Sequence, residues 1–225
     1  MDDVARFCAR MLGDGPGART ADESARAGGD ADRSAMLRAA VTAVRQGSEP
    51  ASEPAPNAPA ADPADDGTAA PAEDRPTDPD ALPQAIAREL AAASAALPLA
   101  QREALALREL LRLSYAEVAD ATGVAADAVP LLLAQARLDL RAQLRGAGVP
   151  QPECDERERA LRTIALRQDG EEVPAADEDW LIEHLGHCRG CRQAHAAMLE
   201  ASACYRAWAS PDLPADPVAG AVSGS

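Results

Sequence analysis

The sequence contains no lysine, few aromatic residues and no long apolar run. All 22 basic residues of the 225-residue chain are arginines, which, beside the many alanines, indicates a GC-rich coding bias rather than a chemical function. Aromatic residues make up only 2% of the chain, and there are 18 prolines. The length is enough for one or two domains, but with this composition we do not expect a single large core.

Three further absences limit where the protein works and what it does. No stretch is apolar enough to span a bilayer, and no basic and then apolar leader follows Met1, so we expect a cytoplasmic protein with no membrane partner. The 5 cysteines, most of them assignable to a metal site, indicate a reducing compartment rather than a disulfide framework. No Ser-His-Asp set or carboxylate pair stands out, so we do not expect an enzyme.

The net charge of -15 is unevenly distributed. Between Glu49 and Asp80 there are nine acidic residues and one basic residue, Arg75, interleaved with proline, alanine and serine. Such a segment buries too little apolar surface to become ordered, so we predict a disordered acidic linker over 47–80 and a disordered tail over 210–225. The linker can mimic a polyanion in a basic groove, but a solvated tether is the favoured interpretation.

The residues from 183 to 191 carry metal-ligand side chains at a spacing that suits one tetrahedral zinc ion. His184 and Cys188 are one helical turn apart, and a helix that ends near Leu185 directs both toward one point. The Cys-x2-Cys spacing places the Cys191 thiolate near the same point, and Cys154 completes a Cys3His set. Four protein ligands leave no open position for a water molecule, so the predicted zinc is structural.

Other assignments for these residues remain open. The cysteines can instead be small buried thiols of a reduced protein. His195 lies one turn after Cys191 and is the alternative imidazole, whereas His187 is expected to point away from the site. We expect Cys204 to be a core residue and Cys8 to be a buried or inactive thiol.

The His-x3-Cys-x2-Cys spacing, within residues 177–208, resembles the zinc-binding anti-sigma domain, a small helical module of bacterial transcription regulators. The resemblance implies a domain of this kind over 148–209. The gap between Cys154 and His184 is longer than the usual one in the family, and the turn-rich residues 168–174 can absorb the difference.

A helix-turn-helix unit is predicted over 81–147. Residues 114–117 form an S-x-x-E capping box, and Gly123 supplies a left-handed stop. A second helix follows from about Ala128 to Leu144, with Asp127 as its cap because Pro130 is tolerated only in a first turn. The strings at 97–104, 108–110 and 113–119 resemble region four of the extracytoplasmic-function sigma factors. That family reads promoter DNA with the second helix of this unit while also holding RNA polymerase.

The sequence departs from that family where DNA contacts are expected. Residues 84–145 contain seven arginines and seven acidic residues, so we expect promoter DNA to be bound weakly or conditionally. The stripe Arg137, Arg141 and Arg145 is the candidate phosphate contact, although a solvated helix face is an equal alternative. Leucines replace the polar contacts at the start of the second helix. We predict that they contact protein, either a separate partner or the apolar side of the zinc module around residues 180–185; they are Leu131, Leu132 and Leu133.

The first 46 residues faintly resemble sigma region two. The resemblance covers 4–14 and 33–40, and the segment is about half the family's length, with Phe7 as its sole aromatic residue. The platform that stacks flipped bases is therefore absent, and we expect a shortened helical hairpin.

The predicted fold is all-α, and two functions follow from the motifs. The first is a sigma-like transcription regulator that binds RNA polymerase core and promoter DNA and is restrained by its zinc module. The alternative is a regulator that does not bind DNA and instead holds a separate sigma factor or a polymerase subunit.

Overall fold

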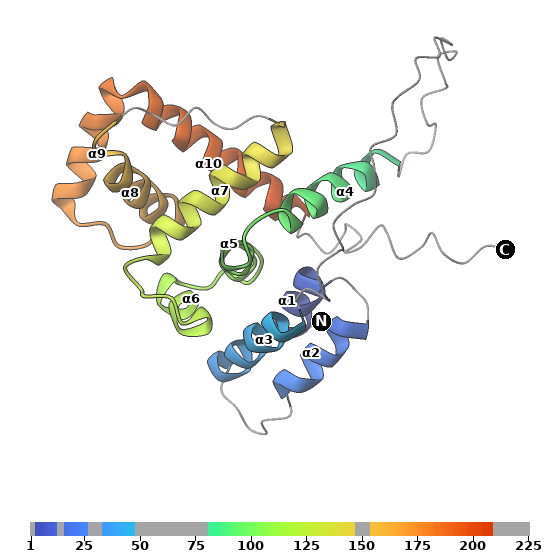
Figure 1. Ribbon diagram of the computed structural model, residues 1–225. Helices are drawn as coiled ribbons and strands as arrows, with labels where there is room; N and C mark the ends of the chain where they lie inside the picture. Colours follow the sequence, from blue (N-terminus) through green and yellow to red (C-terminus); the bar gives the residue numbers. More distant parts are fainter. Residues whose placement is uncertain (1–2, 13–15, 27–32, 48–80, 147–153, 209–225) are drawn as a thin grey trace, which may run out of the picture.

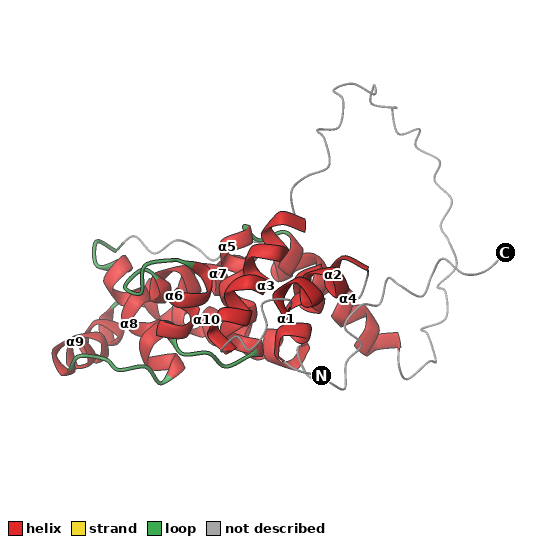
Figure 2. Cartoon of the chain, turned by 90° about the horizontal axis from the view of Figure 1, so that it is seen from below, coloured by secondary structure: helices red, strands yellow, loops and turns green. Residues whose placement is uncertain are grey.

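The computed structural model describes residues 3–12, 16–26, 33–47, 81–146 and 154–208. Within these ranges every regular element is a helix, which confirms the predicted all-α fold (Figures 1 and 2). The helices are α1 (Asp3–Leu12), α2 (Pro16–Arg26), α3 (Arg33–Gly47), α4 (Ala81–Ala95), α5 (Leu99–Leu105), the π-helical turn η1 (Ala106–Leu110), α6 (Tyr115–Thr122), α7 (Val129–Arg145), α8 (Arg157–Asp169), α9 (Ala175–His187) and α10 (Arg189–Trp208).

The start and end of α6 were predictable from local sequence. The Ser114 side chain accepts a hydrogen bond from the Glu117 amide, and the Glu117 carboxylate accepts one from the Ser114 amide at 2.8 Å. This is the predicted capping box. Gly123 then ends the helix with a φ of 75°, in the left-handed region that glycine adopts without strain.

The start of α7 differs from the prediction. Ala128, not Asp127, precedes the first helical residue, and no side chain caps the helix. Pro130 is the second residue of α7, where a missing amide hydrogen costs nothing, so it fixes the helix start without a polar cap. The backbone carbonyl of Asp127 instead accepts a hydrogen bond from Arg162 of α8.

The described residues of the N-terminal segment form three helices, not the expected hairpin (Figure 1). Helix α1 packs on η1 and α3 packs on α6, while α2 packs on α1 and α3. Phe7 of α1 is fully buried in the main apolar core. Arg45 of α3 contributes an ion pair to Glu103 of α5 at 2.6 Å, and the Glu103 side chain is fully buried. The aromatic residue of this segment therefore serves packing.

Helix α7 lies between two apolar clusters. Leu133 and Leu140 belong to a cluster that extends through α1, α3, α5, η1 and α6 to the end of α10. Ala134 and Leu138 belong to a second cluster, built mainly from α8, α9 and α10. Both faces of α7 are thus covered, and Figure 1 shows it running between α8–α10 and the α5–α6 side.

Other predictions concern parts of the chain that are not described. Residues 48–80 of the predicted linker and the predicted tail lie outside the described residues. Among the described helices, none combines the length and apolarity needed to cross a membrane.

Candidate metal centre and the helix interface beside it

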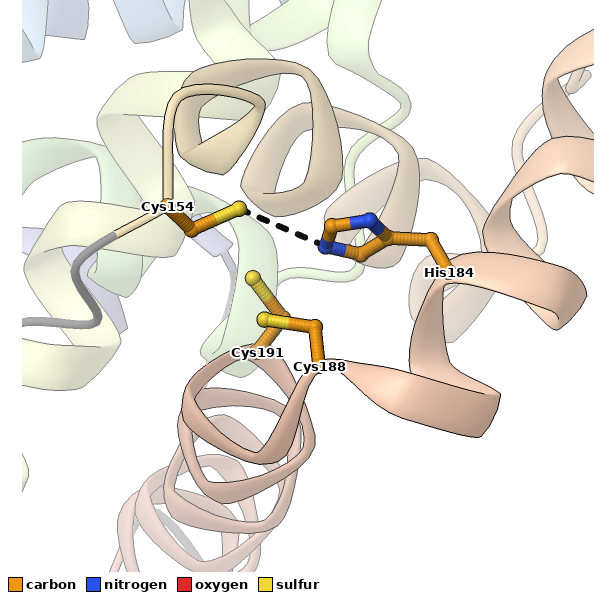
Figure 3. Close-up of side chains that lie close together, drawn as sticks. All are labelled: Cys154, His184, Cys188 and Cys191. Atoms are coloured by element: carbon orange, nitrogen blue, oxygen red, sulfur yellow. Dashed lines mark hydrogen bonds between the residues drawn. The ribbon is translucent and has the colours of Figure 1, made fainter.

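Four side chains, two of them on helices α9 and α10 and two just outside helices, lie close together (Figure 3). They are the predicted set, and their ligand atoms all lie within 4.8 Å of one another. The Sγ atom of Cys154 is 3.6 Å from Nε2 of His184. Cys154 lies just before α8, His184 on α9, and the other two cysteines at the junction of α9 with α10; these are Cys188 and Cys191.

The junction between α9 and α10 brings the two cysteines of the motif together. Helix α9 ends at His187, two residues later than expected, and the Cys188 amide still donates to the His184 carbonyl at 2.8 Å. Cys188 is extended, with φ of -87° and ψ of 98°, and α10 begins at the next residue. This sharp change of direction places Cys191, in the first turn of α10, beside Cys188.

The thiols differ in their electrostatic surroundings. Hydrogen bonding from the Cys191 backbone lowers the pKa of Cys188, whereas burial raises the pKa of Cys191 to about 12. A divalent cation among these sulfurs would deprotonate them outright. Three thiolates and one imidazole at this separation form a donor set able to hold a metal ion, and such a set is typical of tetrahedral zinc.

The other candidate residues lie outside this cluster. His187 is exposed, as expected of a side chain that points away from the site. His195 is half-buried, and burial together with Arg167 lowers its pKa. Cys8 is buried in the main core, and Cys204 packs against the same core.

The predicted arginine stripe on α7 is paired with carboxylates along its whole length. The Arg137 side chain is fully buried, with Nη2 at 2.7 Å from Glu109 and 2.8 Å from Asp169. Burial alone would lower the pKa of Arg137, but the two carboxylates raise it above its ordinary value. A phosphate cannot reach a guanidinium in this position, so in this structure Arg137 is a core residue and not a surface contact.

Arg141 and Arg145 share one carboxylate, that of Glu200 on α10. The Nε atom of Arg141 is 3.2 Å from Oε2, and that of Arg145 is 3.1 Å from Oε1. Hydrogen bonding from Arg145 lowers the pKa of Glu200, so the carboxylate is charged at neutral pH and the pairing weakens only as the pH falls through that lowered pKa.

The three leucines at the start of α7 are covered in the full chain. Leu133 is fully buried in the main core, and Leu132 packs against the same core. Leu131 packs against the second cluster, which also contains Leu181 and the partly buried Trp180. Leu131 therefore lies with the apolar side of the C-terminal helices, one of the two partners expected for it.

Sequence reasoning missed a buried polar network that joins η1 and α7 to the C-terminal helices. Glu109 accepts hydrogen bonds from Arg137 and from Ser202 of α10, the latter at 2.7 Å, and forms an ion pair with Arg206 at 3.4 Å. Asp169 accepts one from the Tyr115 hydroxyl at 2.6 Å. One signal was available, because Glu109 follows the apolar Leu105 by four residues and so shares its core-facing side.

Comparison with known proteins identifies one segment of the chain. Residues 87–140, which run from α4 into α7, match the family described as Sigma-70, region 4. No curated protein and no solved structure matches the chain. The match supports a sigma-factor-like regulator of transcription initiation and points to a protein that is not an enzyme. It implies RNA polymerase core and promoter DNA as partners.

Proposed function

We propose that the chain is a sigma-factor-like transcription regulator whose helix-turn-helix domain is restrained by its own C-terminal zinc-binding, anti-sigma-like module. The observation that carries the proposal is the state of the α7 stripe, in which every arginine is paired with a carboxylate. Two of these carboxylates, Asp169 and Glu200, belong to the C-terminal helices. Arg141 and Arg145, the two arginines of the stripe that a DNA phosphate could reach, are therefore neutralised by Glu200 of the same chain.

Packing supports the same restraint. Helices α8 and α10 both contact α7, and Leu138 of α7 lies in the apolar cluster of the C-terminal helices. Access of a DNA groove to this face requires α8 and α10 to move away. The proposed units are a helix-turn-helix domain over 81–147 and a zinc module over 148–209.

The proposed zinc ion would be held by Cys154, His184, Cys188 and Cys191. It would supply a cross-link among the start of α8, the end of α9 and the start of α10. The helices that it would fix are those that carry Asp169 and Glu200 to α7. A structural metal would thereby fix the positions of the helices whose carboxylates pair with the arginines of α7.

The N-terminal segment, 1–46, is proposed to be a reduced form of sigma region two. Helix α1 packs on η1, α3 packs on α6, and Phe7 of α1 is buried in the main apolar cluster. With Phe7 committed to packing, the segment has no aromatic residue to receive a flipped base. Its proposed role is to hold the helix-turn-helix domain and polymerase, not to melt DNA.

Neutralising Glu200 tests the restraint in the full chain. Glu200→Gln removes the shared carboxylate, so Arg141 and Arg145 become available to phosphates. We expect tighter binding to duplex DNA at low salt, with a plot of log affinity against log salt steeper by about 2, since each neutralised phosphate adds about 0.9. Fluorescence anisotropy across a salt series measures both quantities.

The matched control is Glu172→Gln, which removes the same charge from an exposed glutamate in the loop after α8. Equal gains in both variants would mean that net charge alone, not release of the two arginines, governs DNA binding. No change in the Glu200 variant would contradict the proposed restraint.

A second candidate function is a protein-binding regulator that holds a separate sigma factor or a polymerase subunit. The observation that favours it is the approach to α7, where the exposed residues include Ala125, Ala126 and the acidic Asp127. These residues offer DNA no cation. If neither the wild type nor the Glu200 variant binds DNA at low salt, and the purified chain retains a separate sigma factor rather than core polymerase, this function replaces the first.

A further inference from the structure

The imidazole of His184 is held in an unusual way for a proposed metal ligand. Its Nε2 faces the Cys154 sulfur, so Nδ1 is the nitrogen directed away from the cluster. Ligating histidines generally donate that second N–H to a carboxylate or carbonyl, which fixes the ring. Among the described residues, the side-chain contacts of His184 include the one with Cys154 and a ring stack with Trp180.

A stack with Trp180 also holds the imidazole ring of His184. Trp180 precedes His184 by four residues on α9, so the two side chains share a face of the helix. Their ring centroids are 4.8 Å apart, and the ring planes are inclined by only 20°. This ring stack restricts rotation of the imidazole about its side-chain bonds.

The indole is itself fixed by Arg159 of α8. The guanidinium carbon of Arg159 lies 4.0 Å from the Trp180 ring centroid, in a cation–π contact. Arg159 is in turn held by Asp177, with Nη2 at 2.7 Å from Oδ1. The contacts therefore connect Arg159 of α8 to His184 through the Trp180 indole. Cys154, another proposed ligand, lies just before the same helix.

We infer that Trp180 is a positioning residue of the metal centre, which orients the His184 imidazole through a ring stack supported by Arg159. The inference rests on the metal-binding part of the proposed function. A ligand held in its binding orientation before the ion arrives loses less freedom when the ion binds. Removal of the indole is therefore expected to lower metal affinity without removing any donor atom.

The experiment titrates Co²⁺ into the full-length apoprotein under reducing conditions and compares Trp180→Ala, Trp180→Phe and wild type. Changes to groups that orient a ligand typically cost about 10–100-fold in metal affinity, and we expect a loss in this range for Trp180→Ala. Trp180→Phe keeps an aromatic face and is expected to recover most of the affinity. The matched control is Ile182→Ala, because Ile182 lies on the same helix and the residue is 56% exposed.

The absorption spectrum of the Co²⁺-loaded protein separates positioning from general stability. At saturation, Trp180→Ala should keep the thiolate charge-transfer bands but alter the visible ligand-field bands, which report the imidazole's orientation. If Trp180→Ala does not fold, Arg159→Met, which leaves every ring in place, should show a smaller loss of affinity and the same spectral change.

The outcomes separate the two ideas. Wild-type protein that binds no Co²⁺ would overturn the metal centre and the inference with it. Wild-type protein that binds Co²⁺, beside Trp180→Ala with the same affinity and the same spectrum, would overturn only the role of Trp180. An equal loss in Ile182→Ala would also overturn it, because the effect would then come from α9 as a whole.

Discussion

Replacement of Arg137 by alanine is expected to destabilise the protein by about 3–5 kcal/mol, the usual cost of removing one partner from a buried ion pair. The side chains of Glu109 and Asp169 are 1% and 3% exposed, so water cannot solvate them once the guanidinium is gone. The neutral hydroxyls of Ser202 and Tyr115 remain, but the remaining cations, Arg206 for Glu109 and Arg108 for Asp169, lie farther away, at 3.4 and 3.5 Å. Urea unfolding followed by circular dichroism measures the loss.

Arg141→Ala is the matched control, one helical turn further along α7. Its ion pair with Glu200 is partly exposed, and such pairs contribute about 0–1 kcal/mol. The double variant Arg137→Ala with Glu109→Gln should lose less than the sum of its single changes, because no uncompensated charge remains at Glu109. A free energy of unfolding for Arg137→Ala equal to that of Arg141→Ala would contradict the buried network.

Removal of the proposed zinc should have the second large effect, confined at first to the C-terminal helices. Apparent binding free energies of structural zinc are about 10–16 kcal/mol, and this energy contributes directly to folding. Chelation, or Cys191→Ser, should therefore strip hydrogen-exchange protection from α8, α9 and α10. Because bound thiolates are deprotonated, protons compete with the metal, and affinity should fall as the pH is lowered.

The control for this prediction is Cys204→Ser, a half-buried cysteine of α10 outside the cluster, which should keep one zinc per chain. Elemental analysis that finds no zinc in protein purified under reducing conditions would refute the site. If Cys154→Ser retains the metal while His195→Ala loses it, the site stands and only the choice of ligands is wrong.

Signals that act within a few residues were readable from the sequence. The capping box at Ser114 and the left-handed Gly123 depend on local backbone geometry alone, and both occur as predicted. The Cys188 and Cys191 spacing is local as well. Cys154 lies 30 residues from His184, and its place in the cluster depends on how α8 packs against α9. The sequence spacing alone could not decide whether Cys154 is a member of the cluster.

The features that sequence reasoning missed depend on which element covers which face. Helical periodicity correctly puts Arg137, Arg141 and Arg145 on one side of α7, but it does not tell whether solvent, DNA or another helix meets that side. The helices that cover this side of α7 are α8 and α10. That their carboxylates, Asp169 and Glu200, pair with the arginines of α7 follows only from the three-dimensional packing. The domain boundaries and the DNA contacts of Arg141 and Arg145 stay predictions.

Because α7 lies between two apolar clusters, the unfolding of one cluster is coupled to the unfolding of the other. Leu133 and Leu138 point into different clusters from the same helix, so melting of either cluster removes part of the packing that stabilises α7. The stability of each cluster therefore depends in part on the other through α7. Evolution of such a chain is constrained accordingly, because a substitution on either face of α7 alters the stability of both halves at once.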